Sequence, residues 1–240
     1  MLRIAMWSGP RNISTALMRS FENRPDTVVC DEPLYAHYLR HVPVEHPGRE
    51  EVMAAHDDNW QSVVERLTRL DMPGTAIFYQ KHMAHHLLPH ISREWLGYLV
   101  NCFLIRNPRA MLASLSAKMG RPELRDTGLP QQVEIFRLVQ HDTGQIPPVI
   151  DSADVLRDPR ATLGRLCDAV GIEFLEAMLA WPPGRRDTDG VWAKYWYDAV
   201  ERSTGFGSPV EREVQLSPPL EELAQACLPF YEELAEHRLR

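Results

Sequence analysis

The 240-residue sequence lacks long apolar runs, signal-peptide features and closely spaced cysteines. No run approaches the ~18 apolar residues of a membrane-spanning helix, so we expect no membrane segment. Only about six residues of apolar character precede the first polar stretch, which predicts a first strand rather than a signal peptide. The four cysteines show no CxxC spacing, which argues against a redox or metal role. Together these features favour a cytoplasmic protein with buried thiols.

Lysine is also scarce, and the balance of charge is acidic. The formal net charge is −7, and only three of the 26 cationic residues are lysines: Lys81, Lys118 and Lys194. The acidic balance argues against broad nucleic-acid binding, because no overall basic field would attract phosphates. A local basic pocket is compatible with this composition, and arginine guanidinium groups would supply most of its charge.

What the sequence does contain is an alternation of short apolar segments with longer amphipathic ones. Predicted strands cover residues 2–7, 27–30, 75–79, 98–105 and 148–151. Predicted helices begin near Ile13 and cover residues 59–70, 108–118, 129–140, 159–170 and 218–240, the last interrupted at Pro229. An irregular excursion is expected over residues 33–60, and residues 181–217 show no clear element.

This order of elements predicts the α/β fold class. We expect a single domain over residues 1–240, with a central parallel sheet, flanking helices and right-handed crossovers. Sheets of this kind bind their ligands at the carboxyl ends of the strands. Candidate functional residues should therefore directly follow strands.

The turn after the first strand is a candidate anion site of the P-loop type. It consists of Gly9, Pro10, Arg11, Asn12, Ile13, Ser14 and Thr15. Such a turn offers backbone N–H groups, a helix N-terminus with roughly +0.5 charge, two hydroxyls and a guanidinium. It lacks the second glycine and the lysine of the GxxxxGK[ST] signature, and no lysine precedes Lys81. The turn therefore lacks the residues that usually bind magnesium-bound ATP.

Three further groups of polar residues follow predicted strands. Glu32, after the second strand, offers a carboxylate that can accept a proton from an attacking group. Lys81 and His82 follow the third strand, where a cation facing the turn could stabilise negative charge on a leaving oxygen. Arg106 follows the fourth strand, and with Ser114 on the next helix it could hold one phosphate from two sides.

The N-terminal motifs resemble the opening of sulfotransferases. They are Gly-Pro-Arg-Asn-Ile-Ser-Thr-Ala-Leu-Met-Arg-Ser-Phe, then Asn-Arg-Pro-Asp, then Cys-Asp-Glu-Pro. The likeness is greatest to the tyrosylprotein and bacterial sulfolipid-precursor branches, whose loop for the 5′-phosphosulfate is of the type Pro-Arg-Ser-Gly-Thr-Thr. This chain has Asn12-Ile13 in place of Ser-Gly, whereas Arg11, Ser14 and Thr15 keep their places.

The resemblance implies a sulfotransferase-like fold related to P-loop NTPases, with 3′-phosphoadenosine 5′-phosphosulfate (PAPS) as co-substrate and no required metal. It implies that Arg106 and Ser114 bind the 3′-phosphate of the donor, and that Glu32 is the catalytic base, with His82 as the alternative. Arg11 and Lys81 would stabilise the bridging oxygen as it leaves.

The resemblance also implies an acceptor with a hydroxyl or an amine, either a small molecule or a peptide. The excursion over residues 34–60 and an aromatic stretch are candidates for the walls of its pocket, although aromatic residues at such density also occur as simple core. The aromatic residues concerned are Trp192, Tyr195, Trp196 and Tyr197. A segment closing over the 3′-phosphate is expected around Lys194, Ser203, Thr204 and Gly205.

Other interpretations stay open at this point. A divergent P-loop kinase or nucleotide hydrolase using magnesium with ATP or GTP would take Asp31 as the end of a Walker B strand, but the absent lysine argues against it. A non-catalytic nucleotide-binding module is another alternative. His82, His85, His86 and His90 suggest a metal site, but no carboxylate or cysteine accompanies them, so we expect no metal.

Overall fold

Five parallel strands form the central sheet of the computed structural model, which describes residues 1–208 and 214–240. The strands are β1 (Leu2–Ser8), β2 (Thr27–Asp31), β3 (Ile77–Met83), β4 (Val100–Ile105) and β5 (Val149–Asp151). Their order in the sheet is β2-β3-β1-β4-β5, with every neighbouring pair parallel. The predicted α/β class with a central parallel sheet is confirmed.

The central strand β1 lies where the strand order diverges. It pairs with β3 on one side and with β4 on the other, so that Ser8 is level with both Met83 and Leu104. In open parallel sheets, crevices form outside the carboxyl ends of strands at such a switch point. The turn that follows Ser8 is therefore placed where this fold binds ligands.

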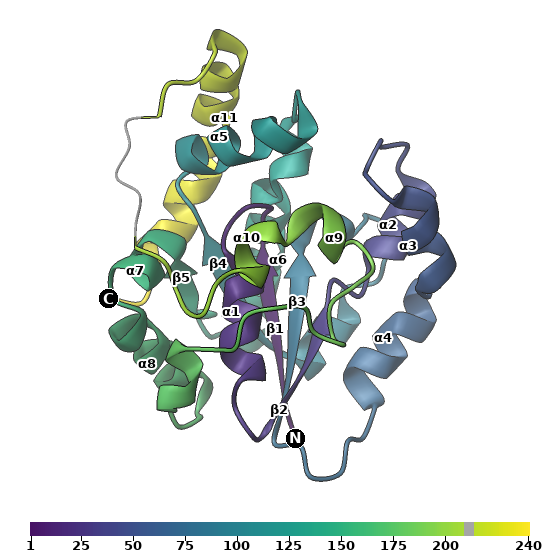
Figure 1. The fold of residues 1–240 in the computed structure, drawn as a ribbon, viewed down its shortest axis with the longest axis vertical. Helices are drawn as coiled ribbons and strands as arrows, with labels where there is room; N and C mark the ends of the chain where they lie inside the picture. Colours follow the sequence, from purple (N-terminus) through teal and green to yellow (C-terminus); the bar gives the residue numbers. More distant parts are fainter. Residues whose placement is uncertain (209–213) are drawn as a thin grey trace.

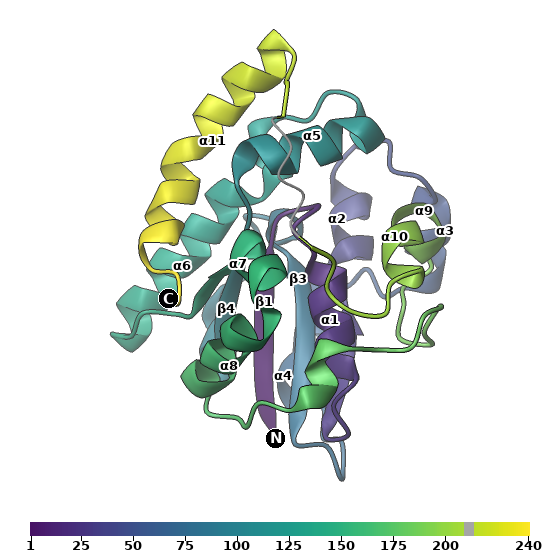
Figure 2. The same cartoon turned by 60° about the vertical axis from the view of Figure 1, so that its left-hand side comes forward.

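Helices cover both faces of the sheet, as Figures 1 and 2 show. One face packs against α4 (Trp60–Arg69), α6 (Leu129–Thr143) and α11 (Pro218–Glu236). The other face packs against α1 (Ser14–Glu22), α7 (Ser152–Arg157) and α8 (Pro159–Val170). Alternate residues of each strand enter the two cores, which explains why the strands read as almost continuous apolar runs.

The remaining helices surround the carboxyl edge of the sheet and its flanks. They are α2 (Tyr35–His41), α3 (Arg49–Ala55), α5 (Pro108–Met119), α9 (Ala193–Trp196), α10 (Asp198–Glu201) and the short 3₁₀ turns η1 (Ala84–His86), η2 (Glu94–Tyr98), η3 (Leu124–Thr127) and η4 (Glu176–Leu179). A separate aromatic core joins α2 and α3 to Trp192 and Tyr197. Buried Arg19 of α1 binds Asp189 at 2.6 Å and so attaches this late segment to α1.

Three local predictions were wrong. Residues 33–60 contain two helices, α2 and α3, whose buried side chains pack against residues far along the chain, so their local periodicity is weak. Strand β3 continues through Lys81 and His82 to Met83 rather than ending at Tyr79. Helix α11 passes through Pro229 without a break and packs against α5 and α6.

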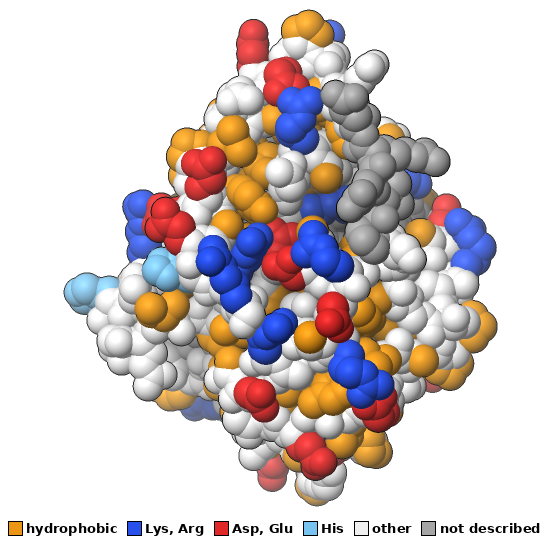
Figure 3. All heavy atoms as spheres, turned by 90° about the vertical axis from the view of Figure 1, so that its left-hand side faces the viewer, with side chains coloured by type: hydrophobic (Ala, Val, Ile, Leu, Met, Phe, Trp, Pro, Cys, Tyr) orange, Lys and Arg blue, Asp and Glu red, His pale blue; other side chains and the backbone are white. Residues whose placement is uncertain are grey.

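The expectation for residues 181–217 is only partly testable. The short helices α9 and α10 lie within it, and residues 209–213 are outside the described part of the chain. Across the described residues, no helix has the length and apolar character needed to cross a membrane. Figure 3 shows basic and acidic side chains interspersed on one face of the molecule.

Candidate functional site

A cavity of about 400 Å³ opens at the carboxyl edge of the sheet. The turn after β1 forms one wall, Glu32 after β2 and Lys81 of β3 form another, and Arg106 follows β4. Residues between Trp196 and Gly207, from much later in the chain, close the cavity on a further side. The sheet topology thus brings together the strand-end residues that the sequence singled out.

The turn after β1 holds an unusual backbone conformation. Arg11 and Ile13 both have a φ of 61°, in the left-handed region, while Asn12 between them does not. For a residue other than glycine such a conformation costs about 1–3 kcal/mol, and it is least expected for a β-branched residue such as Ile13. Alternation of this kind turns successive backbone N–H groups toward one point and creates a concave anion site.

The N-terminus of α1 adds to this anion site. Within the described residues no side chain caps the helix, whose N-cap position is Ile13. The first N–H groups of an uncapped helix, together with the positive end of its dipole, are free to bind an anion. Ser14 and Thr15 begin the helix and line the cavity beside them.

Gly9 allows the turn to lie close to the protein core. A Cβ atom at Gly9 would lie 2.2 Å from the carbonyl oxygen of Thr127. The Gln132 amide fixes the same region by donating to the Trp7 carbonyl at 3.0 Å and to the Leu104 carbonyl at 3.2 Å. Gly9 itself is beneath the turn, whereas residues from Pro10 onward line the cavity.

Gly9→Ala is therefore expected to lower the free energy of unfolding by about 1–3 kcal/mol, because a rigid backbone carbonyl occupies the space of the new methyl group. Gly164→Ala, in α8, is the matched control, since its Cβ would meet nothing within 4 Å. The control should gain about 0.5–1 kcal/mol from helix propensity. Urea unfolding of the parent and both variants measures these free energies. A Gly9→Ala variant as stable as the parent would refute the proposed packing of the turn.

Two partly buried arginines face the anion site. Arg11 donates from Nε to Ser114 Oγ at 2.9 Å, and Arg106 donates from Nη1 to the Arg11 carbonyl. Burial lowers the pKa of both guanidinium groups, and Arg11 lowers that of Arg106 further. Neither arginine forms a salt bridge with a carboxylate among the described residues. Two neighbouring, partly buried and planar guanidinium groups favour an anionic ligand whose oxygens can accept two hydrogen bonds from one group, such as a phosphate.

The hydrogen bonds of Lys81 differ from the expected role, in which its ammonium faces the turn and stabilises a leaving oxygen. Its ammonium donates to Asp31 at 2.8 Å, to Glu32 at 2.5 Å and to the Tyr197 hydroxyl at 2.7 Å. An ammonium has three N–H donors, so all are used in these bonds rather than directed across the cavity toward Arg11. Burial opposes its charge, but the two carboxylates raise the pKa of Lys81 well above its ordinary value. Lys81 therefore holds Glu32 in place.

Glu32 presents its carboxylate to the cavity. Burial raises its pKa above the ordinary value of 4.5, Lys81 lowers it in part, and Asp31 raises it. Its backbone is strained, with a φ of 38°, and its N–H donates to the Lys81 carbonyl at 2.9 Å. A fixed carboxylate with a raised pKa has the properties of a general base.

The structure places His82 away from the cavity, which corrects the expectation that it could serve as a base. Because β3 continues to Met83, side chains alternate, and Lys81 and Met83 face the cavity while His82 points to the opposite side. His82 stacks on Trp7 at 4.3 Å and bonds Gln80 Oε1 at 3.2 Å. Burial lowers the pKa of His82 to about 3, so it stays neutral.

Three histidines of the cavity wall were not predicted to lie there, although the sequence suggested His85 and His86 as candidate metal ligands. His86 lines the cavity with its Nδ1 4.0 Å from Glu32 Oε2, and it stacks on Tyr35 at 4.7 Å. Burial, with His85 beside it, lowers the pKa of His86 well below its ordinary value. His46 and His85 also contribute to this wall. In the sequence, this wall was indicated only by the density of histidines between the predicted strands.

The aromatic stretch is divided between cavity and core. Trp196 and Tyr197 line the cavity, whereas Trp192 is buried in the core with α2 and α3, and Tyr195 packs against Gly48. The predicted closing segment is divided too. Ser203 and Gly205 reach the cavity, but the Lys194 ammonium binds Glu51 at 2.6 Å on the surface.

Comparison with protein families gives a match over almost the whole chain. The family described as "Sulfotransferase domain" matches residues 2–238. A curated relative, Branched-chain-amino-acid aminotransferase-like protein 1 of Arabidopsis thaliana, is 38% identical over 236 residues, which are 98% of this chain and 42% of the relative. The chain thus spans about two fifths of the length of the curated relatives it matches.

Solved structures agree on the fold. The sulfotransferase from Alicyclobacillus acidocaldarius superposes with a TM-score of 0.56 at 14% identity, covering 100% of this chain and 97% of that one. The sulfotransferase domain from the curacin biosynthetic pathway gives 0.55 at 14% identity, covering 94% and 96%. These likenesses support the family match through the fold. The narrower resemblance to the tyrosylprotein and sulfolipid-precursor branches stays a prediction.

Proposed function

The chain belongs to the sulfotransferase domain family, and from that premise we propose that it transfers a sulfuryl group from PAPS to a hydroxyl or amine of a small-molecule or peptide acceptor. The main support is the pairing of two partly buried arginines with an uncapped helix N-terminus on one side of a cavity that has a held carboxylate on the other. An anionic donor and a neutral nucleophile need these two environments.

The proposed reaction is an in-line displacement at sulfur. The acceptor oxygen or nitrogen forms a bond to sulfur while its proton passes to Glu32. The bond from sulfur to the bridging oxygen breaks, and that electron pair leaves with 3′,5′-diphosphoadenosine. The products are the sulfated acceptor and the diphosphate, and the proton later passes from Glu32 to solvent. No electron is transferred and no oxidant is needed.

We assign the donor phosphates to the basic side of the cavity. The 5′-phosphosulfate would lie on the turn from Pro10 to Thr15, with Arg11 close to the bridging oxygen, where negative charge builds up. Arg106 and Ser114 would bind the 3′-phosphate. A sulfuryl group carries less negative charge than a terminal phosphoryl, so arginine and backbone donors can serve without a metal. Lys81 acts here as a positioning residue for Glu32.

Amino transfer, which the name of the plant relatives suggests for those longer proteins, is not part of the proposal. A pyridoxal-dependent enzyme needs a lysine that becomes a neutral amine and forms a Schiff base. Lys81 is the lysine of the described cavity, and its pKa is raised well above the ordinary value by Asp31 and Glu32 although burial opposes its charge. An ammonium held in this way is unsuited to that role.

The direct test is a turnover assay with PAPS, EDTA and a panel of hydroxyl and amine acceptors. Release of 3′,5′-diphosphoadenosine that depends on an acceptor, with matching mass increase of that acceptor, is the expected result. Tight binding of the diphosphate with no transfer to any acceptor would instead indicate a non-catalytic module.

A further inference from the structure

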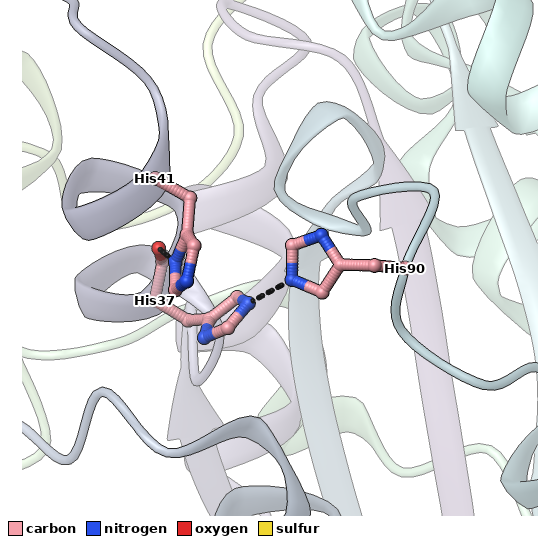
Figure 4. Close-up of side chains that lie close together, drawn as sticks. All are labelled: His37, His41 and His90. Carbon is pink, nitrogen blue, oxygen red and sulfur yellow. Dashed lines mark hydrogen bonds between the residues drawn. The ribbon is translucent and has the colours of Figure 1, made fainter.

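Three histidines form a cluster that is separate from the cavity lining, and Figure 4 shows them as sticks. His37 and His41 lie one turn apart on α2, and His90 follows η1. One ring nitrogen from each lies within 4.8 Å of the other two, and the ring centroids are 4.1 to 5.0 Å apart. His37 is buried, whereas His41 and His90 are exposed.

Hydrogen bonds to backbone carbonyls determine the tautomers of two of these rings. His37 Nδ1 lies 2.8 Å from the Asp58 carbonyl oxygen, and His41 Nδ1 lies 2.9 Å from the His37 carbonyl oxygen. A carbonyl can only accept, so both Nδ1 atoms carry the proton and the Nε2 atoms of the neutral rings carry lone pairs, that of His37 accepting from His90. A histidine that binds a metal through one nitrogen typically donates the other N–H to such a carbonyl.

We propose that His37, His41 and His90 bind a divalent transition-metal ion of the zinc type. Three imidazole nitrogens with an open fourth position for water are a known zinc arrangement, and the exposed rings of His41 and His90 leave room for that water. The donor set within the described residues is nitrogen alone, which suits zinc, nickel or copper rather than magnesium or calcium. Asp58, whose carbonyl oxygen bonds His37, has its carboxylate on Arg40 at 2.7 Å.

Metal binding requires the rings to move at two places. Two nitrogens bound to one tetrahedral zinc at about 2.1 Å lie about 3.4 Å apart. His37 Nε2 and His90 Nε2 are now 2.7 Å apart, joined by the hydrogen bond drawn in Figure 4. The exposed His90 ring would therefore move outward by several tenths of an ångström. The His41 nitrogen, which lies within 4.8 Å of the other two, would move inward by up to about 1.4 Å to reach tetrahedral spacing. His90 Nε2 donates the proton of the bond to His37, and on metal binding that proton would pass through solvent to Nδ1 of the same ring, leaving the Nε2 lone pair for the metal.

Such an ion would connect α2 with the segment after η1. Both elements also contribute to the cavity wall, through Tyr35 of α2 and His86 of η1, which stack on each other. The ion would thus stabilise one wall of the cavity without touching the reacting groups. The inference does not rest on sulfuryl transfer, and its test needs no activity.

The test uses the full chain after dialysis against a chelator, titrated with Zn²⁺ by calorimetry and with Co²⁺ by visible absorption. One equivalent of Zn²⁺ should bind, and Co²⁺ should give the absorption of a four- or five-coordinate site. His41→Ala and His90→Ala should each weaken binding by more than about 100-fold, because loss of a group that only orients a metal ligand already costs about 10- to 100-fold. His141→Ala, an exposed histidine that pairs with Asp142, is the matched control and should bind as the parent does.

Melting temperature provides a second readout that separates binding from folding. Zn²⁺ should raise it in the parent and in His141→Ala, but not in His41→Ala or His90→Ala, whose exposed rings should be dispensable for folding in EDTA. Absence of Zn²⁺ binding to the parent would overturn the proposal and leave a hydrogen-bonded histidine cluster. Unchanged affinity in both ligand variants would overturn it as well.

Discussion

Arg106→Ala is expected to weaken the binding of 3′,5′-diphosphoadenosine by about 10- to 100-fold, because a charge-assisted hydrogen bond contributes about 1.5–3 kcal/mol. The guanidinium is partly buried, and among the described residues it bonds a backbone carbonyl and no carboxylate, so its charge is available to a phosphate. Calorimetric titration at one fixed salt concentration measures the effect, since phosphate binding depends on ionic strength.

A control and a second ligand determine where Arg106 acts. Arg165→Ala removes the same charge from an exposed position on α8 and should leave the affinity unchanged. Arg106 also donates to the Arg11 carbonyl, so its loss could distort the turn. Adenosine 5′-monophosphate distinguishes the two effects, because it lacks the 3′-phosphate. If both ligands weaken equally, Arg106 supports the turn and its assignment to the 3′-phosphate is wrong.

Glu32→Gln is expected to lower kcat by about 10²- to 10⁴-fold, the usual contribution of a general base. The amide keeps the size of the side chain, and Lys81 retains its bonds to Asp31 and Tyr197, so the fold and donor binding should persist. Glu65→Gln, exposed on α4, is the matched control. Full turnover by Glu32→Gln, measured as release of the diphosphate, would remove Glu32 from the mechanism.

The same carboxylate should produce a particular pH dependence. A base must be deprotonated, so kcat should fall as the pH drops through the pKa of Glu32. Burial raises that pKa above the ordinary value of 4.5, with Lys81 opposing and Asp31 reinforcing the shift. The acid limb of the kcat profile should therefore lie above pH 4.5 and disappear in the residual activity of Glu32→Gln. An acid limb at or below pH 4.5 would contradict the assignment.

The elements that could be predicted are those with a local signal. Helix α8 begins at Pro159, after Asp158, whose side chain caps it, and it ends at Gly171, all features of a short sequence window. The strand-end residues of the site could be predicted for a similar reason. In a parallel sheet the carboxyl ends of all strands share one edge. The prediction that the strands are parallel therefore suffices to place Glu32 and Arg106, which each follow a strand, at the same cavity.

The features that could not be predicted depend on distant contacts or on the exact residue at which a strand ends. Extension of β3 to Met83 decides that Lys81 faces the cavity and His82 does not. Tyr197 bonds Asp31 from 166 residues away, which no window on the sequence reveals. The histidine cluster likewise needs α2, a helix hidden in a segment rich in histidine and proline, to pack beside His90.

The most direct test of the central claim is calorimetric titration of the protein with 3′,5′-diphosphoadenosine in EDTA, beside a parallel titration with ATP and magnesium. The partly buried arginines and the uncapped helix N-terminus predict binding of the diphosphate without metal, and no binding of magnesium-bound ATP in the parallel titration. Binding of magnesium-bound ATP, with none of the diphosphate, would contradict the account and favour a kinase or nucleotide hydrolase.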